Sequence, residues 1–306
     1  MERHLQGLQC AKFIETEKVN SNGEYKIMHE FLKLAEPVLF QISFITQAML
    51  ATFLIALLFE KLRPASKNIP MYHRETPFEL LNVFIITLTV WPLALYCINT
   101  FFLDALQNAF TYDFTSRTVR SWPLWLQMIS AAVLLDFGLY WYHRMMHAWL
   151  WPFHAVHHET ENVNWSTSWR FHPLDIIISF FTLLILYFVG YPAESIFFAS
   201  FAVHIMSNFT HFNTRLSWPG PLKYLLTSPH FHHWHHAKAK DAIDKNFCIV
   251  FPFLDLLFGT FYCPKPEPEK YGIFQPQIPG GMIGKFFLPF VEQGRKIRGL
   301  LTKPKT

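Results

Sequence analysis

Long uncharged runs separated by polar connections dominate the first half of the chain. The segments 37–59 and 80–103 contain no charged residue. Each is longer than the about 20 residues that an α-helix needs to cross the hydrocarbon core of a bilayer. The segment 122–142 is also long enough, and it carries a single acid, Asp136. We therefore expect three transmembrane helices in these positions.

Two shorter apolar segments, 176–191 and 195–209, follow in the second half. Between them stands Gly190-Tyr191-Pro192, a combination that breaks a helix. We expect a helical hairpin that either spans the membrane or re-enters it. The whole pattern predicts an all-α integral membrane protein with four to five transmembrane or re-entrant helices.

Composition supports this prediction and excludes several other classes of protein. Of the 306 residues 51% are hydrophobic and only 16% are charged, whereas a typical soluble domain has about 25% charged residues. The four cysteines are scattered and form no CxxC pair, which excludes a disulfide framework and a zinc ribbon. The net charge of +4 is spread along the chain, so we expect no nucleic-acid partner.

The order of the spans predicts which segments share a side of the membrane. If the third span ends near residue 143 and the hairpin returns near residue 211, residues 143–173 and the chain from 211 onward lie on one face. The connection between the first two spans and the C-terminal tail 265–305 lie on that face too, and both are rich in Lys and Arg. By the positive-inside rule this face is cytoplasmic. We predict a multi-pass protein of the endoplasmic reticulum in a eukaryote or of the inner membrane in a bacterium.

Histidines are concentrated on this predicted cytoplasmic face. Thirteen of the sixteen follow residue 142, and most belong to the clusters HRMMH at 143–147, HAVHH at 154–158 and HHWHH at 232–236. Spacings of three and four residues place imidazoles on one face of a helix, as metal ligands require. We therefore expect a helical cap that holds metal. The candidate ligands are His143, His147, His154, His157, His158, His211, His232, His235 and His236.

This number of imidazoles exceeds what one ion uses, since zinc takes four ligands. The clusters therefore imply a dinuclear site, and imidazole alone does not select the metal. Asp136 lies two helical turns before His143 and shares a stripe with Tyr140, so it could accept the second N–H of a ligating ring. His172 and His204 are further candidates, as extra ligands or as residues that support the ligands.

At these residues the chain resembles the sterol desaturase and fatty acid hydroxylase superfamily of integral-membrane di-iron oxygenases. The similarity runs from about residue 122 to 262. Its carriers are HRMMH, FHAVHHETENVNWSTSWRFHPLD (153–175), THFNTRL (210–216), SPHFHHWHH (228–236) and DKNF followed by LDLLFGTF (244–261). The RFHP segment is most similar to the sterol-acting and bacterial branches.

The resemblance implies two iron ions held by the nine histidines named above, with His211 at the position that precedes the last histidine box. It implies an O₂-dependent enzyme that hydroxylates or desaturates a C–H bond of a sterol or fatty-acyl lipid. The chain lacks the HPGG haem motif of relatives with a fused cytochrome b5 domain. We expect electrons from a separate donor of the cytochrome b5 or ferredoxin type, with its reductase.

Four regions follow from this interpretation: a polar and amphipathic arm (1–36), a first transmembrane hairpin with its connecting loop (37–121), the catalytic domain (122–262) and a basic tail (263–306). The residues that bind substrate stay open. Interface aromatics are the candidates: Trp141, Tyr142, Trp165 and Trp169.

Two alternatives remain at this point. One is a carotenoid or alkylglycerol type of lipid monooxygenase, which uses similar boxes. The other is a membrane protein that binds or transports metal. Transporters place their ligands near the bilayer midplane on broken helices, whereas these clusters fall at or beyond the ends of the predicted spans.

Overall fold

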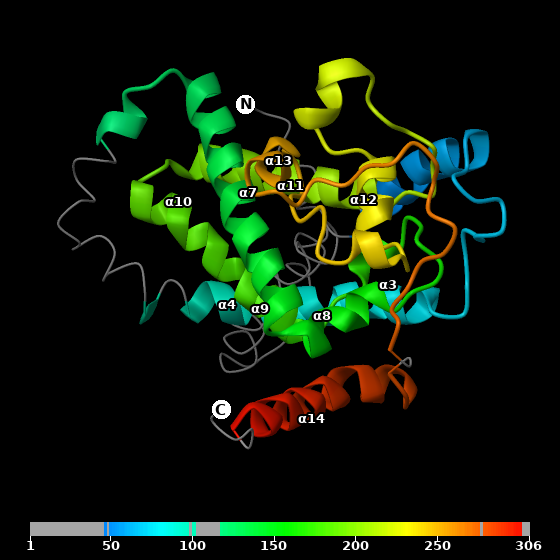
Figure 1. The fold of residues 1–306 in the computed structure, drawn as a ribbon. Helices are drawn as coiled ribbons and strands as arrows, with labels where there is room; N and C mark the ends of the chain where they lie inside the picture. The colour runs from blue at the N-terminus through cyan, green and yellow to red at the C-terminus, as the bar shows by residue number, and fades with distance from the viewer. Residues whose placement is uncertain (1–45, 48, 98–99, 102–116, 276–277, 302–306) are drawn as a thin grey trace, which may run out of the picture. The chain divides into compact units, whose positions relative to one another are not determined.

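The computed structural model describes residues 46–47, 49–97, 100–101, 117–275 and 278–301. This part of the chain contains helices joined by loops and no β-strand, apart from an isolated bridge between Ala237 and Tyr271 (Figure 1). The predicted all-α class is confirmed for these residues. The N-terminal arm 1–36 lies outside them.

The longest helix, α7 (Leu124–Ala148), matches the predicted third span. Among the described residues it is the one helix that is long and apolar enough to cross a membrane. It extends beyond residue 143, so its last turns carry the first histidine cluster. Of the predicted first span, residues 49–59 belong to a helix that continues to 62, and residues 37–45 lie outside the described part.

The segment predicted as a second span is divided into shorter pieces. It consists of α3 (Thr76–Ile85), a π-helical stretch η3 (Ile86–Val90) and α4 (Trp91–Cys97). Residues 98–99 and 102–103 are outside the described part. The number of spans therefore stays a prediction.

The predicted hairpin is present, and its turn is where the sequence places it. The first arm comprises α9 (Pro173–Phe180), η6 (Phe181–Leu183) and α10 (Leu184–Val189), and the second arm is α11 (Ala193–Thr210). Gly190 ends α10 with φ of 83°, a left-handed conformation that glycine adopts without steric cost.

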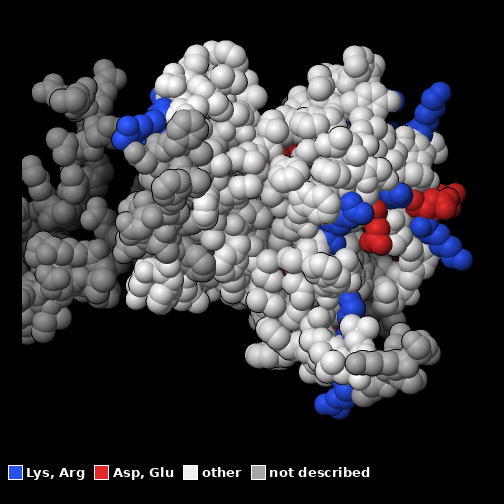
Figure 2. Space-filling model, turned by 60° about the vertical axis from the view of Figure 1, so that its left-hand side comes forward, with Lys and Arg blue, Asp and Glu red and all other residues white. Residues whose placement is uncertain are grey.

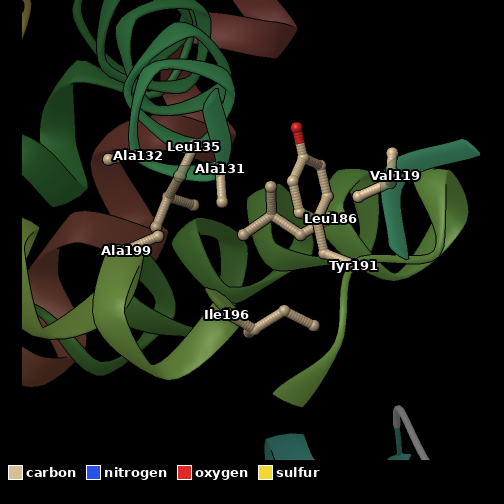
Figure 3. Packing of buried hydrophobic residues seen from close by; sticks show 8 residues of the cluster. All are labelled: Val119, Ala131, Ala132, Leu135, Leu186, Tyr191, Ile196 and Ala199. Carbon is tan, nitrogen blue, oxygen red and sulfur yellow. The ribbon is translucent and has the colours of Figure 1, made fainter. Parts of the chain in front are cut away.

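Small side chains bring α7 and α11 close together. Ala131 and Ala132 of α7 and Ala199 of α11 belong to a buried cluster that α10 completes through Leu186 (Figure 3). Small residues let helix backbones approach closely, which is the usual packing of helices in membranes. Because α7 and α11 pack against each other, His143 on α7 and the residue after α11, His211, can contribute to two neighbouring groups of histidines.

The remaining described elements are shorter helices and one long C-terminal helix. They are α8 (Trp151–His158), η5 (Thr167–Trp169), η7 (Gly220–Tyr224), α12 (Pro229–His235), η8 (Lys240–Ala242), α13 (Phe253–Leu257) and α14 (Gly281–Leu301). Helix α14 packs on α8.

Much of the described surface is apolar and uncharged. Leu124, Trp125 and Ile129 near the start of α7 and Phe197 and Phe201 on α11 are exposed. In Figure 2 most of the described surface carries neither acid nor base, and most charged side chains lie toward the right-hand side of the view. Exposed apolar surface of this extent is typical of a protein in contact with lipid.

Candidate metal centre

The first histidine cluster lies in the last two turns of α7. His143 and His147 are four residues apart and point to the same side, with ring centroids 5.2 Å apart. The Nδ1–H of His143 donates to the carbonyl oxygen of Phe247 at 2.8 Å. Nδ1 of His147 lies 3.2 Å from Oδ1 of Asp244. Both rings therefore turn their Nε2 atoms away from these partners.

The second cluster lies on α8, which has a proline in its first turn. Pro152 stands in the first turn, where its missing N–H has no intrahelical partner to lose. Nδ1 of His154 lies 2.8 Å from Oδ2 of Asp175. The Nδ1–H of His157 donates to the carbonyl oxygen of Arg170 at 3.0 Å.

The third cluster lies on α12 and is joined by the histidine that follows α11. Ser228 caps α12 by accepting a hydrogen bond from the N–H of Phe231 at 3.3 Å. The Nδ1–H of His235 donates to the carbonyl of Lys245 at 2.8 Å. The Nδ1–H of His211 donates to the carbonyl of Ser207 at 2.6 Å.

The structure gathers all nine predicted histidines into two groups. The five-histidine group consists of His143, His147, His154, His158 and His235. The four-histidine group consists of His157, His211, His232 and His236. Within each group the ligand nitrogens lie within 4.8 Å of one another, so each group could hold one metal ion. Residues adjacent on α8, His157 and His158, belong to different groups, which places the groups side by side.

The short distances between Nε2 atoms are those expected around a bound cation. Nε2 of His211 lies 3.2 Å from Nε2 of His157, although both rings carry their hydrogen on Nδ1. Two bare lone pairs at this distance repel each other unless a cation lies between them. Nitrogens bound to a metal at about 2.1 Å are separated by roughly 3.0 to 3.4 Å in octahedral or tetrahedral geometry. The observed separations agree with this range.

The other Nε2 atoms follow the same pattern. His232 lies 3.0 Å from His211, and His143 lies 3.0 Å from His154, in each case between Nε2 atoms. In the five-histidine group, the Nε2 atoms of His147, His158 and His235 are buried and have no hydrogen-bond partner. Buried polar atoms without a partner are rare, and a metal ion would satisfy all three.

Burial keeps these rings neutral. Desolvation, reinforced by the neighbouring imidazoles, lowers the pKa of several rings well below the ordinary value of 6.5: His154, His157, His158, His232, His235 and His236. Burial also lowers the pKa of His211 to about 4. Neutral imidazole is the form that binds metal, so the site is ready for a metal at neutral pH.

The comparison with protein families gives this centre its context. Residues 128–260 match the model of the family described as fatty acid hydroxylase. They include all nine histidines. This region is similar to fatty acid hydroxylases.

Relatives of this region act on several lipids. An ornithine lipid hydroxylase of Rhizobium tropici is 29% identical over 81% of this chain and 76% of its own length. The human alkylglycerol monooxygenase is 34% identical over 48% of this chain, and a very-long-chain aldehyde decarbonylase of Oryza sativa subsp. indica is 29% identical over 45%. The chain matches only 33% and 25% of the lengths of these last two relatives. No solved structure is significantly similar to the chain.

Two of the further candidates lie outside both histidine groups. His172 caps α9, with Nδ1 accepting from the N–H of Leu174 and Nε2 lying 3.0 Å from the carbonyl oxygen of Phe286. His204 is exposed on α11 and contacts Asn208 through its carbonyl oxygen and Nε2. Neither ring is placed to share a metal with the nine.

Asp136 and Tyr140 are also placed differently from the prediction. Asp136 accepts hydrogen bonds from the N–H groups of Ile249, Val250 and Phe251 at 2.7–3.0 Å, so its oxygens hold a loop and not an imidazole. The Tyr140 hydroxyl pairs with Thr260 at 2.9 Å and accepts from Arg144 at 3.2 Å. The helical stripe was correct, but the partners on neighbouring segments are backbone groups and other side chains.

The carboxylate that does contact a histidine of the second cluster is Asp175. It is fully buried in the first turn of α9. Sequence reasoning did not select it, although an acid at the start of an apolar helix is a costly placement that indicates a partner. Asp244, which contacts His147, was likewise not selected.

A buried network of ion pairs centred on Arg170 contacts α8. Arg170 is completely buried, and its Nε donates to the carbonyl of Val156 at 2.6 Å. Its guanidinium forms ion pairs with Glu75, Glu79 and Glu159. Glu79 lies 91 residues before Arg170 in the sequence, and no local pattern predicts that they meet.

A cavity of about 310 Å³ opens beside the five-histidine group. Three of its lining residues belong to that group: His147, His158 and His235. Its other walls combine apolar and polar side chains: Trp151, Ile243, Ile273, Phe274, Asp244, Gln275 and Lys296. The four interface aromatics proposed from the sequence as rim residues do not line this cavity. It is the candidate path to the metal centre.

Proposed function

We propose that this protein is a membrane-bound, O₂-dependent enzyme that hydroxylates or desaturates a C–H bond of a lipid, with two iron ions bound by nine histidines. The observation that carries the proposal is the pair of adjacent, buried groups whose Nε2 atoms converge. One ion would be held by the five-histidine group and the other by the four-histidine group. Imidazole suits iron among other transition metals.

The bound iron pair would supply the activation of O₂, with electrons from a separate donor protein. The chain itself holds six of the nine imidazoles in one tautomer, because main-chain carbonyls and carboxylates accept from their Nδ1 atoms. Burial excludes water from the rings, which protects a reactive site from side reactions. The cavity beside the five-histidine group brings one carbon of a lipid chain to the centre and keeps the bulk of the lipid outside.

The lipid is expected to carry a long aliphatic chain. The relatives named above act on an ornithine lipid, an alkylglycerol and very-long-chain aldehydes, and an extended chain is their shared feature. Trp151, Ile273 and Phe274 give the cavity walls that suit such a chain. A fatty-acyl lipid is therefore our first candidate and a sterol the second.

The alkylglycerol type remains the alternative within this class. Its support is the identity of 32–34% to alkylglycerol monooxygenases from three vertebrates over about half of this chain. A metal transporter is less well supported, since both histidine groups lie at the ends of α7 and α11 and not within a broken span. We further propose that the metal centre faces the cytoplasm.

Lipid mass spectrometry tests the proposed function directly. Total lipids are extracted from cells that express the protein and from cells that express the His157→Ala variant. Gain of one oxygen atom in a lipid class indicates hydroxylation, and loss of two hydrogen atoms indicates desaturation. Identical lipid profiles, with both proteins present in the membrane and the wild-type protein loaded with iron, would contradict the proposal.

A further inference from the structure

The partners of the Nδ1 atoms differ between the two histidine groups. In the described part of the chain, two carboxylates contact histidines of these groups, and both contact the five-histidine group: Asp175 on His154 and Asp244 on His147. In the four-histidine group, His157 and His211 donate to main-chain carbonyls. A carboxylate is a stronger acceptor than a carbonyl, because it is charged.

The two carboxylates are not equivalent. The Asp244 side chain is 65% exposed, so solvent screens its charge. Asp175 is fully buried, and its other oxygen, Oδ1, accepts a hydrogen bond from the hydroxyl of Tyr142. The same hydroxyl lies 2.9 Å from the main-chain carbonyl oxygen of Asp175. Tyr142 therefore fixes the carboxylate that faces His154.

Asp175 is also fixed by its position in the helix. It lies in the first turn of α9, two residues after Pro173, and its N–H donates to the carbonyl of His172 at 3.0 Å. Hydrogen bonds therefore hold both the side chain and the backbone of Asp175. The contact at 2.8 Å is thus a built feature of the fold and not a chance encounter at the surface.

We infer that Asp175, oriented by Tyr142, is a positioning residue that makes the five-histidine site the stronger and more electron-rich of two unequal metal sites. The inference rests on the proposed function, since it needs both groups to bind metal. Asp175 holds the hydrogen of His154 on Nδ1 and leaves the Nε2 lone pair for the ion. A carboxyl oxygen that accepts from Nδ1–H at 2.8 Å makes the ring a better donor to a metal.

The cavity lies mainly beside the site that we infer to be the stronger of the two. The cavity is lined by three rings of the five-histidine group and by one ring of the four-histidine group, His236. The ion that a substrate would meet first is therefore the one supported by carboxylates. An ion held by the four-histidine group would lie farther from the cavity, because His157, His211 and His232 do not line it.

Metal affinity of each site tests this inference in the purified full-length protein in lipid nanodiscs. Metal-free protein is titrated with Fe²⁺ under anaerobic conditions in competition with a chelator, and Mössbauer spectra are recorded for the loaded protein. In Asp175→Asn we expect one site to lose about 10- to 100-fold in affinity and its spectral component to shift. The second site should keep its affinity and its spectrum.

A matched pair of substitutions on α7 controls for structural damage. Tyr142→Phe removes the hydroxyl that donates to Asp175, and we expect a loss at the same site in the same direction as Asp175→Asn but smaller. Tyr140→Phe removes a hydroxyl two residues earlier that bonds to Thr260 and Arg144 instead. It should leave both sites unchanged. If Asp175→Asn does not fold, the two tyrosine variants decide the question.

A ligand variant identifies the affected site. His232→Ala should remove the spectral component of the four-histidine group, and the component that remains should be the one that shifts in Asp175→Asn. Equal weakening of both sites, or no change at either, would overturn the inference. A wild-type protein that binds fewer than two ions would instead contradict the proposed function.

Discussion

Lys285 of α14 donates a hydrogen bond to Glu159, the residue that directly follows His158. Glu159 also pairs with Arg170, whose own carbonyl accepts from His157. A charge on the C-terminal helix is thus connected through one carboxylate to the helix that carries three of the nine histidines. The contact spans 126 residues of sequence.

Replacing Lys285 by Met should destabilise the protein. Lys285 is buried, and its loss leaves Glu159 with one cation fewer in a buried environment. Breaking a buried ion pair costs about 3 kcal/mol or more. Thermal unfolding followed by circular dichroism should show a lower midpoint. The control is Lys296→Met, which removes an exposed lysine of the same helix that donates to the carbonyls of Ala148 and Trp149; an equal shift in both variants would contradict the role of Glu159.

Replacing His157 by Ala should reduce the metal content from two ions per chain to one or fewer and abolish lipid oxidation. His157 contributes Nε2 to the four-histidine group, and its loss leaves three imidazoles there. Metal analysis of purified protein checks this result. His172→Ala is the matched control, because it removes a buried histidine outside both groups. It should keep both ions and cost about 1 kcal/mol of stability through the lost helix cap.

Acidification should lower the free energy of unfolding of the metal-free protein. Burial lowers the pKa of His154, His157, His158, His232, His235 and His236 below 6.5, and that of His211 to about 4. Between these values the unfolded chain binds protons that the folded chain excludes, so stability is full above pH 6.5 and falls as the pH decreases toward 4. Each such histidine contributes up to about 1.4 kcal/mol per pH unit. Unfolding midpoints measured from pH 8 to pH 4 check this, and a midpoint that rises on acidification would refute it.

Filling the cavity should block turnover without removing metal. Ile243 is about half exposed on the cavity wall, so Ile243→Trp adds bulk there without disturbing the core. We expect lipid oxidation to fall at least about tenfold, the effect of losing roughly 1.4 kcal/mol of transition-state stabilisation. Metal content should be unchanged. Ile283→Trp, an exposed position on α14 that does not line the cavity, should keep full activity.

Cysteine labelling tests the proposed orientation in the membrane. Leu225 is exposed in the loop between α11 and α12, and Arg120 is exposed before the start of α7. A membrane-impermeant thiol reagent should label Leu225→Cys only from the cytoplasmic side and Arg120→Cys only from the opposite side. Wild-type protein gives the background of the native cysteines. The reverse pattern would overturn the topology.

The sequence predicts the candidate ligands of the site better than the side chains that form hydrogen bonds to them. Spacing along a helix places His143 with His147 and His154 with His158, because these pairs depend on helical geometry alone. Periodicity also selects Asp136 as a neighbour of His143. It does not reveal that a loop from residues 249–251 occupies that carboxylate, while Asp175 from a different helix contacts His154.

In the fold, too, local features could be predicted from the sequence and long-range contacts could not. Gly190 and Pro192 determine the hairpin turn by their own backbone preferences, and the structure has it there. The apolar segment 80–103 has the length of a span, but it contains a π-helical stretch at Ile86–Val90 and a proline in the next turn. Hydropathy measures neither backbone irregularity nor the ionic contacts of α14 with α8.

The loop at residues 245–251 forms hydrogen bonds both to two imidazoles and to two buried acids. Its carbonyls at Lys245 and Phe247 accept from His235 and His143, and its N–H groups are held by two buried acids, Asp136 and Asp255. None of these bonds requires an ion. The polypeptide therefore orients two of the candidate ligand rings without a metal, so a metal ion could bind after folding and be replaced without unfolding the chain.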